Sequence, residues 1–205
     1  MCINAKTSLI AFMLGSLSGL YLLTGNEENK IIGFYVIFYS LIQLFELNIY
    51  LQNNVELNSK LLLLNLGAQG LIFFMLLKRL YKIKLIYFII TGIIFSIFLL
   101  HILTNKIEKG TIDNCINSNA STVSTCIKWN FLTDNLSYAL YLMYAIMIIW
   151  WYNNKKSTTF INKAGYFYIL TFVIFYSYGN IKQKRPGYWC LSSAFLAPIL
   201  LLFKE

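Results

Sequence analysis

Charged residues are scarce in this chain of 205 residues: only 12% are Asp, Glu, Lys or Arg, while 58% are hydrophobic. A soluble domain of this length has roughly a quarter of its residues charged and cannot bury so much apolar surface. The sequence also lacks a glycine-rich phosphate-binding loop and a soluble domain to hold one, which argues against an ATP-driven pump. The composition therefore predicts a protein whose surface faces lipid.

Residues that bind metals or catalyse reactions are also few. The chain has one histidine and four cysteines, with no CxxC or HxxxH spacing, so we expect no metal site and no cofactor. Lys204 lies at the end of the last apolar run, whereas a retinal protein needs a lysine in its middle. Nothing in the spacing supports Cys190 and His101 as a nucleophile and its base, so we do not expect an enzyme.

Long apolar runs dominate the sequence instead. A helix needs about 20 residues to cross ~30 Å of hydrocarbon, and seven runs approach or reach that length: 7–24, 31–51, 60–78, 83–103, 133–152, 164–179 and 187–203. They predict an all-α polytopic transmembrane bundle of about seven helices, in a single transmembrane domain over 1–205. The alternative for residues 1–24 is a cleaved signal peptide, although the end "LYLLTG" is a poor cleavage site.

The basic residues predict how the bundle is oriented. The net charge is +9, and the lysines cluster in short loops beside the ends of the apolar runs, where they meet lipid head groups rather than nucleic acid. The densest basic loop is "KRLYKIK" at 78–84, and 153–163 is on the same side. Placing both in the cytoplasm puts the N-terminus outside. The basic loop at 181–187 then breaks the rule.

The long loop over 104–134 lies on the outer face in this orientation. It contains Cys115 and Cys126, which we expect to form a disulfide, and all four cysteines fall on this oxidising side. Cys2 and Cys190 are a second candidate pair. The triplet "NAS" makes Asn119 a candidate for N-glycosylation.

A few strongly polar side chains interrupt the apolar runs. Gln43 and Glu46 are one turn apart in the second run, and Asn65 and Gln69 are one turn apart in the third. We expect matching depths, which would pair Glu46 with Asn65 and Gln43 with Gln69, with His101 at a comparable height. A charge in the middle of a bilayer costs about 3 kcal/mol or more, so such groups face one another or a water-filled hollow.

Two interpretations of these residues stay open. In the first, they form hydrogen bonds between helices, at about 0.6 kcal/mol each. In the second, they line a polar pocket, open to the outer face, that binds a small polar ligand, a cation or a proton.

The segment "GSLSG" in the first run has the spacing of a close helix contact, with Gly15 and Gly19 one turn apart. Small residues allow helix backbones to approach closely, either within a bundle or between two copies of a chain. We expect packing within the bundle; the alternative is a homo-oligomer through Gly15 and Gly19.

Four segments in order, "MCINAKTSLIAF", "FYSLIQLFE", "NLGAQ" and "GYWCLSSAFLAP", give the chain a family resemblance. It resembles an uncharacterised family of seven-span membrane proteins of large DNA viruses and microbes. The matching positions are Cys2, Ser8, Gln43, Glu46, Gln69, Trp189 and Cys190. The chain departs from the family pattern where Gly70 follows Gln69 in place of proline, and in its cysteine-poor loop after the fourth run. The resemblance implies seven spans and a viral origin, in a host cell or virion membrane, without implying an activity.

Together these features predict an integral multi-pass membrane protein, non-catalytic, with a polar pocket in its outer half. The alternative function is a small-solute transporter or channel that uses the same pocket.

Overall fold

A computed structural model describes residues 5–105, 111–115, 124–128 and 134–154, together with 198 and 201. In these residues the helices are α1 (Ala5–Leu22), α2 (Glu27–Tyr50), α3 (Val55–Leu77), α4 (Leu85–Thr104) and α5 (Asp134–Asn154). The four helices α1 to α4 are long and apolar enough to cross a membrane, which confirms a helix of membrane-spanning length at each of the first four predicted runs. Helix α5 covers nearly all of the fifth predicted run (133–152) but is not one of these four helices. The sixth predicted span lies outside the described residues, as does the seventh apart from residues 198 and 201.

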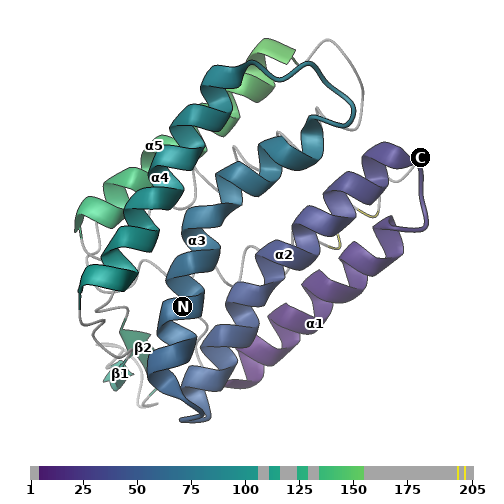
Figure 1. Cartoon of the computed structure of the whole chain (residues 1–205). Coiled ribbons are helices and arrows are strands. Elements are labelled where there is room, and N and C mark those ends of the chain that lie inside the picture. The colour runs from purple at the N-terminus through teal and green to yellow at the C-terminus, as the bar shows by residue number, and fades with distance from the viewer. Residues whose placement is uncertain are drawn as a thin grey trace.

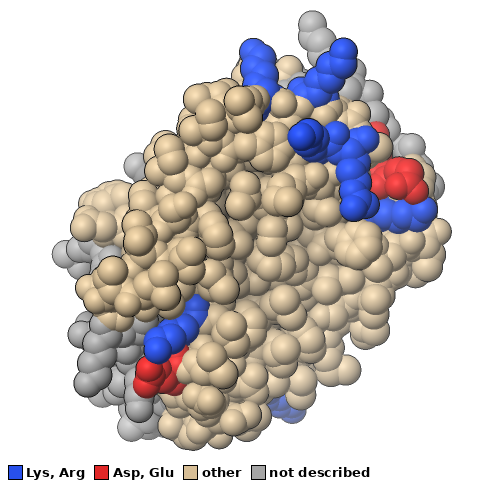
Figure 2. All heavy atoms as spheres, viewed as in Figure 1, with Lys and Arg blue, Asp and Glu red and all other residues tan. Residues whose placement is uncertain are grey.

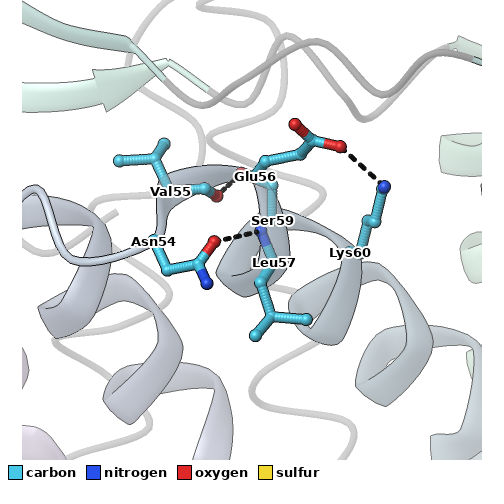
Figure 3. A network of polar contacts seen from close by, with 6 residues as sticks. All are labelled: Asn54, Val55, Glu56, Leu57, Ser59 and Lys60. Atoms are coloured by element: carbon cyan, nitrogen blue, oxygen red, sulfur yellow. Dashed lines mark hydrogen bonds and ion pairs between the residues drawn. The ribbon is translucent and has the colours of Figure 1, made fainter.

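Two helices begin earlier than the apolar runs indicate. Helix α2 begins at Glu27 rather than 31, and α3 begins at Val55 rather than 60. Asn26 and Asn54 cap these helices: the Asn54 side chain accepts a hydrogen bond from the Leu57 backbone N–H at 3.4 Å (Figure 3). Polar residues at a membrane surface still cap and extend a helix, so its start lies beyond the hydrocarbon boundary.

Each helix packs against the helix that precedes it in the chain, and α5 also contacts α3 (Figure 1). Helices α2 and α3 are central. In the most apolar 18-residue stretch of each, 56% of the residues are buried, against 33% for α1 and 17% for α4. Large apolar side chains are exposed along the two outer helices: Leu9, Ile10, Met13 and Leu17 on α1, and Ile86, Ile89, Ile93 and Ile97 on α4. These faces are suited to contact with lipid.

The glycines of α1 are used inside the bundle. Gly15 and Gly19 are buried against α2, where a Cβ on Gly19 would lie 2.8 Å from the Gly33 carbonyl oxygen. Beside them the Ser16 and Ser40 hydroxyl oxygens are 3.1 Å apart. The expected packing of Gly15 and Gly19 within the bundle is observed.

The predicted outer loop contains a hairpin of β1 (Thr111–Cys115) and β2 (Ser124–Lys128). The strands are antiparallel, with Cys115 opposite Ser124 and Cys126 opposite Asp113. The two cysteines are thus diagonal neighbours, whose Cα atoms lie about 7–8 Å apart in such a pair, whereas a disulfide needs about 4.4–6.8 Å. The register does not support the expected Cys115–Cys126 disulfide. Cys2, Cys190 and Asn119 lie outside the described residues.

Candidate functional site

Helix α2 presents a buried stripe of polar side chains. Ser40, Gln43 and Glu46 follow one another at a spacing of three residues, which places them along one side of the helix. All three are buried, and Glu46 is 0% exposed. A buried carboxylate in a membrane-length helix is costly unless polar groups surround it. The neighbouring helices therefore have to supply polar groups at this height.

Helix α3 meets α2 in a register fixed by two hydrogen bonds. The Asn48 side-chain Nδ2 donates to Asn58 Oδ1 at 3.3 Å, and Asn65 Nδ2 donates to the Phe38 carbonyl oxygen at 3.0 Å. Glu46 therefore lies opposite the first turns of α3. The expected pairs, Glu46 with Asn65 and Gln43 with Gln69, are wrong in register. The physical reason is the early start of α3 at Val55, which places both amides deeper in the bundle than the apolar run indicated.

Asn65 and Gln69 belong to a hydrogen-bonded chain that joins three helices. Gln69 Nε2 donates to Asn65 Oδ1 at 3.4 Å, and the Tyr144 hydroxyl of α5 donates to Gln69 Oε1. With the bond from Asn65 to the Phe38 carbonyl, this chain runs from α5 through α3 to α2. For these two amides, the interpretation as hydrogen bonds between helices is therefore observed. Sequence reasoning missed Tyr144, since one tyrosine among 15 gives no signal.

The glycines of "NLGAQG" bring α4 and α5 close to these amides. A Cβ on Gly67 would lie 2.6 Å from Phe98 Cβ, and one on Gly70 would lie 2.6 Å from Met143 Cγ. The Gly70 backbone N–H also donates to the Met143 sulfur at 3.2 Å. Larger residues here would separate the helices that the Gln69–Tyr144 bond joins.

A second polar group forms around Glu46. Gly15 lies against Ser40, and Ser8 is two turns before Gly15, so Ser8 faces α2 about two turns beyond Ser40, near the height of Glu46. Ser59, in the early part of α3, is at the same height by the α2–α3 register. Ser8, Glu46 and Ser59 are all fully buried. We refer to Ser8, Gln43, Glu46 and Ser59 as the Glu46 layer.

The two serines of this layer differ in their hydrogen bonds. The Ser59 hydroxyl donates to the Val55 carbonyl oxygen of its own helix at 2.8 Å (Figure 3). The Ser8 hydroxyl is buried and has no hydrogen-bond partner in the described part of the chain. A buried polar atom without a partner costs about 1–3 kcal/mol. Ser8 is therefore a position where a bound polar group would gain a hydrogen bond.

His101 is placed apart from this layer. It lies in the last turn of α4, where its Nδ1 is 3.2 Å from the Asn105 side-chain nitrogen. Helix α4 packs on α3 and α5, so α3 lies between most of α4 and α2. The sequence predicts His101 near Gln43 and Glu46 only because the three residues have similar depths in their apolar runs. Depth alone does not show which helices are neighbours.

The described residues contain no group of three or more His, Cys, Asp or Glu side chains that could hold a metal ion. The buried polar residues in this part of the chain provide hydrogen bonding by hydroxyls and amides around one carboxyl group, that of Glu46. No protein-family model matches the chain, and the curated proteins and the solved structures give no match either, so any assignment of function rests on these buried polar residues.

Proposed function

We propose that this chain is a non-catalytic, multi-pass membrane protein that binds a small polar ligand or a cation in the Glu46 layer. The observation behind this proposal is the buried Ser8 hydroxyl, which has no partner among the described residues and lies near the height of Glu46. A bound molecule with a polar atom at this height would hydrogen-bond to Ser8. Oxygen atoms from Ser8, Gln43, Glu46 and Ser59 suit a hydrogen-bonding solute or a hard cation.

The two interpretations of the polar residues then apply to two different places. The amide groups of Asn65 and Gln69 form hydrogen bonds with each other, with Tyr144 and with a backbone carbonyl. They therefore hold helices together. A hydroxyl that has no partner holds nothing together. Polar ligand binding therefore accounts for the Ser8 position better than helix association does.

The topology of the proposal follows the charge distribution. The basic loop at 78–84 joins α3 to α4, at the opposite end of the bundle from the Glu46 layer. With that loop in the cytoplasm, the N-terminus and the Glu46 layer are on the outer side. The resemblance noted above supports a viral origin and a host cell or virion membrane.

Native mass spectrometry of the detergent-solubilised protein tests the binding site. We expect a bound small molecule in the wild type that is lost in Glu46→Gln and in Ser8→Ala. The matched control is Glu56→Gln, which removes an exposed carboxylate, paired with Lys60 at 2.7 Å, near the same end of the bundle. The control should keep the ligand. A ligand retained by all three variants, or bound to none of the four proteins, contradicts the proposal.

A second candidate function is transport of a small solute or ion through the same layer. Burial of the ionisable Glu46 in a membrane-length helix favours it, because such residues mark ion and substrate pathways. Flux of Na⁺, K⁺ and H⁺ into liposomes containing the protein tests this alternative. Flux in the wild type that is abolished in Glu46→Gln and kept in Glu56→Gln would establish transport. Absence of flux in the wild type would leave the binding function.

A further inference from the structure

The turn between α3 and α4 presents four cations at one end of the bundle. Lys78, Arg79, Lys82 and Lys84 are all exposed, and we call them the basic platform. Figure 2 shows basic side chains gathered at this end of the molecule, while the faces of the helices between the two ends are free of charge in this view. The platform is the densest basic stretch in the described part of the chain.

The acidic residues nearest the platform are already engaged. Glu27 forms an ion pair with Lys30 at 2.6 Å, and Glu28 accepts a hydrogen bond from the Tyr81 hydroxyl at 3.0 Å. Among the described residues, the ion pairs are Lys30–Glu27 and Lys60–Glu56, so neither includes a platform cation. The platform thus has an excess of positive charge and is suited to an anionic partner.

The platform is held in place by its backbone and by Tyr81. The Leu80 and Tyr81 backbone N–H groups both donate to the Leu77 carbonyl oxygen, at 3.0 and 2.9 Å. The Tyr81 ring packs edge-on against Trp150 of α5, with 5.9 Å between ring centroids, and its hydroxyl reaches Glu28 of α2. A segment fixed from two sides loses little conformational entropy when it binds a partner.

The surroundings of the platform indicate which anion it meets. Leu85 is 71% exposed and Ile86 is 50% exposed directly after Lys84, at the start of the apolar face of α4. The Lys78 ammonium lies 5.7 Å from the centre of the Phe88 ring, so a cation and the apolar face meet at one level. Cations directly above exposed aliphatic and aromatic residues mark the boundary between head groups and hydrocarbon. A soluble anion would make no favourable contact with the exposed Leu85 and Ile86, whereas the acyl chains of a lipid would.

We propose that Lys78, Arg79, Lys82 and Lys84 bind the head groups of anionic phospholipids in the leaflet that they face. This inference rests on the proposed membrane topology, which places the platform at the cytoplasmic surface, where anionic lipids are concentrated. It adds a lipid-binding site at the opposite end of the bundle from the Glu46 layer.

The test compares two double variants that each remove two positive charges. Arg79→Gln/Lys82→Gln alters the platform, and Lys6→Gln/Lys60→Gln is the matched control at the other end of the bundle. Native mass spectrometry measures binding of phosphatidylglycerol and of phosphatidylcholine to the detergent-solubilised full chain. We expect the wild type and the control to prefer phosphatidylglycerol. The platform variant should bind it about fivefold more weakly per charge removed, or roughly 30-fold in all.

Equal phosphatidylglycerol binding by the two double variants would overturn the inference. Inorganic phosphate, compared with chloride at the same ionic strength, should leave lipid binding unchanged; displacement by phosphate would show a soluble-anion site instead. Alkaline carbonate extraction of membranes tests the membrane assignment separately from the lipid site. A chain released by carbonate contradicts the membrane assignment, whereas a chain that is retained but has no preference for phosphatidylglycerol contradicts the lipid site alone.

Discussion

Two hydroxyl groups inside the bundle, those of Ser8 and Tyr144, have opposite uses. Tyr144 donates to Gln69 and so joins α5 to α3. Ser8 is also buried but has no partner in the described part of the chain. Removing the first should cost stability, and removing the second should not. This difference separates a structural polar group from one that is available to a ligand.

Tyr144→Phe should destabilise the protein by about 0.6 to 1.7 kcal/mol, the usual range for a hydrogen bond between membrane helices. Tyr138→Phe is the matched control, because Tyr138 is on the same helix but largely exposed. Thermal unfolding in detergent measures both. Combined with Gln69→Leu, Tyr144→Phe should cost less than it does alone, because both changes remove one shared bond. Additive effects would contradict the bond.

Ser8→Ala should leave the stability of the ligand-free protein unchanged or raise it by about 1 kcal/mol, because it removes a buried polar atom that lacks a partner. Ser16→Ala is the comparison, since the Ser16 hydroxyl is within 3.1 Å of the Ser40 hydroxyl and its loss should destabilise. Chemical unfolding of washed, ligand-free samples measures both variants. An equal loss of stability in the two would show that Ser8 also has a structural role.

Sequence reasoning found only part of this site, for a physical reason. Glu46, Gln43, Asn65 and Gln69 are conspicuous because amides and carboxylates are costly in an apolar run. Serine and tyrosine are not, since a serine hydroxyl can bond to its own helix backbone, as Ser59 does, and a tyrosine ring is largely apolar. Ser8 was indicated only by the family resemblance, and Tyr144 by nothing.

At the scale of elements, close contact between helices depends on particular glycines. Gly19 is covered by α2, whereas Gly92 of α4 has open space where a Cβ would be. The two glycines occur in helices of similar length, so they form a natural pair for comparison.

Gly19→Ala should destabilise the bundle by about 1–3 kcal/mol, because the new methyl group would lie 2.8 Å from the Gly33 carbonyl oxygen and force α1 away from α2. Gly92→Ala should be neutral or stabilising, since alanine favours a helix by about 1 kcal/mol over glycine. Unfolding midpoints in detergent provide the measurement. If both variants melted at the same temperature, the close α1–α2 contact would be wrong.

The hairpin register gives a prediction about the cysteines. Because Cys115 and Cys126 are diagonal rather than opposite, we expect both to be free of a bond to each other. Alkylation of the purified protein without a reductant, followed by peptide mass mapping, should modify both residues. A cross-linked peptide containing the two would show that the strands shift by two residues when the bond forms.

The lengths and order of the first helices were predictable, but their starts and the hairpin were not. Hydrophobic length identifies the part of a helix in lipid, whereas Asn54, Glu56 and Lys60 extend α3 outside it through capping and an ion pair (Figure 3). The Thr and Ile residues of β1 and β2 are a weak strand signal within an Asn- and Ser-rich segment. The depth error for Asn65 followed directly from the error in the start of α3.

At the scale of the whole molecule, the two ends of the bundle differ in charge and should face different compartments. A single cysteine at Lys82, in an otherwise cysteine-free variant, should react with a membrane-impermeant maleimide only after the cells are opened. A single cysteine at the exposed Asn53, between α2 and α3, should react in intact cells. Labelling in the reverse pattern would invert the topology and place the basic platform outside.

The packing of each helix on its predecessor also has a consequence for how the protein is made. The α1–α2, α2–α3 and α3–α4 contacts can form in the order in which the ribosome delivers the helices, with short-range contacts throughout. The contact between α3 and α5 is different, because Tyr144 is synthesised 75 residues after Gln69. The hydrogen bond from the Tyr144 hydroxyl to the Gln69 side-chain carbonyl therefore forms late. Until then Gln69 is a buried polar group with an incomplete set of partners. A chain halted before α5 would therefore lack the Tyr144 partner of the Gln69 side-chain carbonyl, and quality-control proteases can recognise such an unpaired polar group. In a finished chain the Tyr144 hydroxyl occupies it.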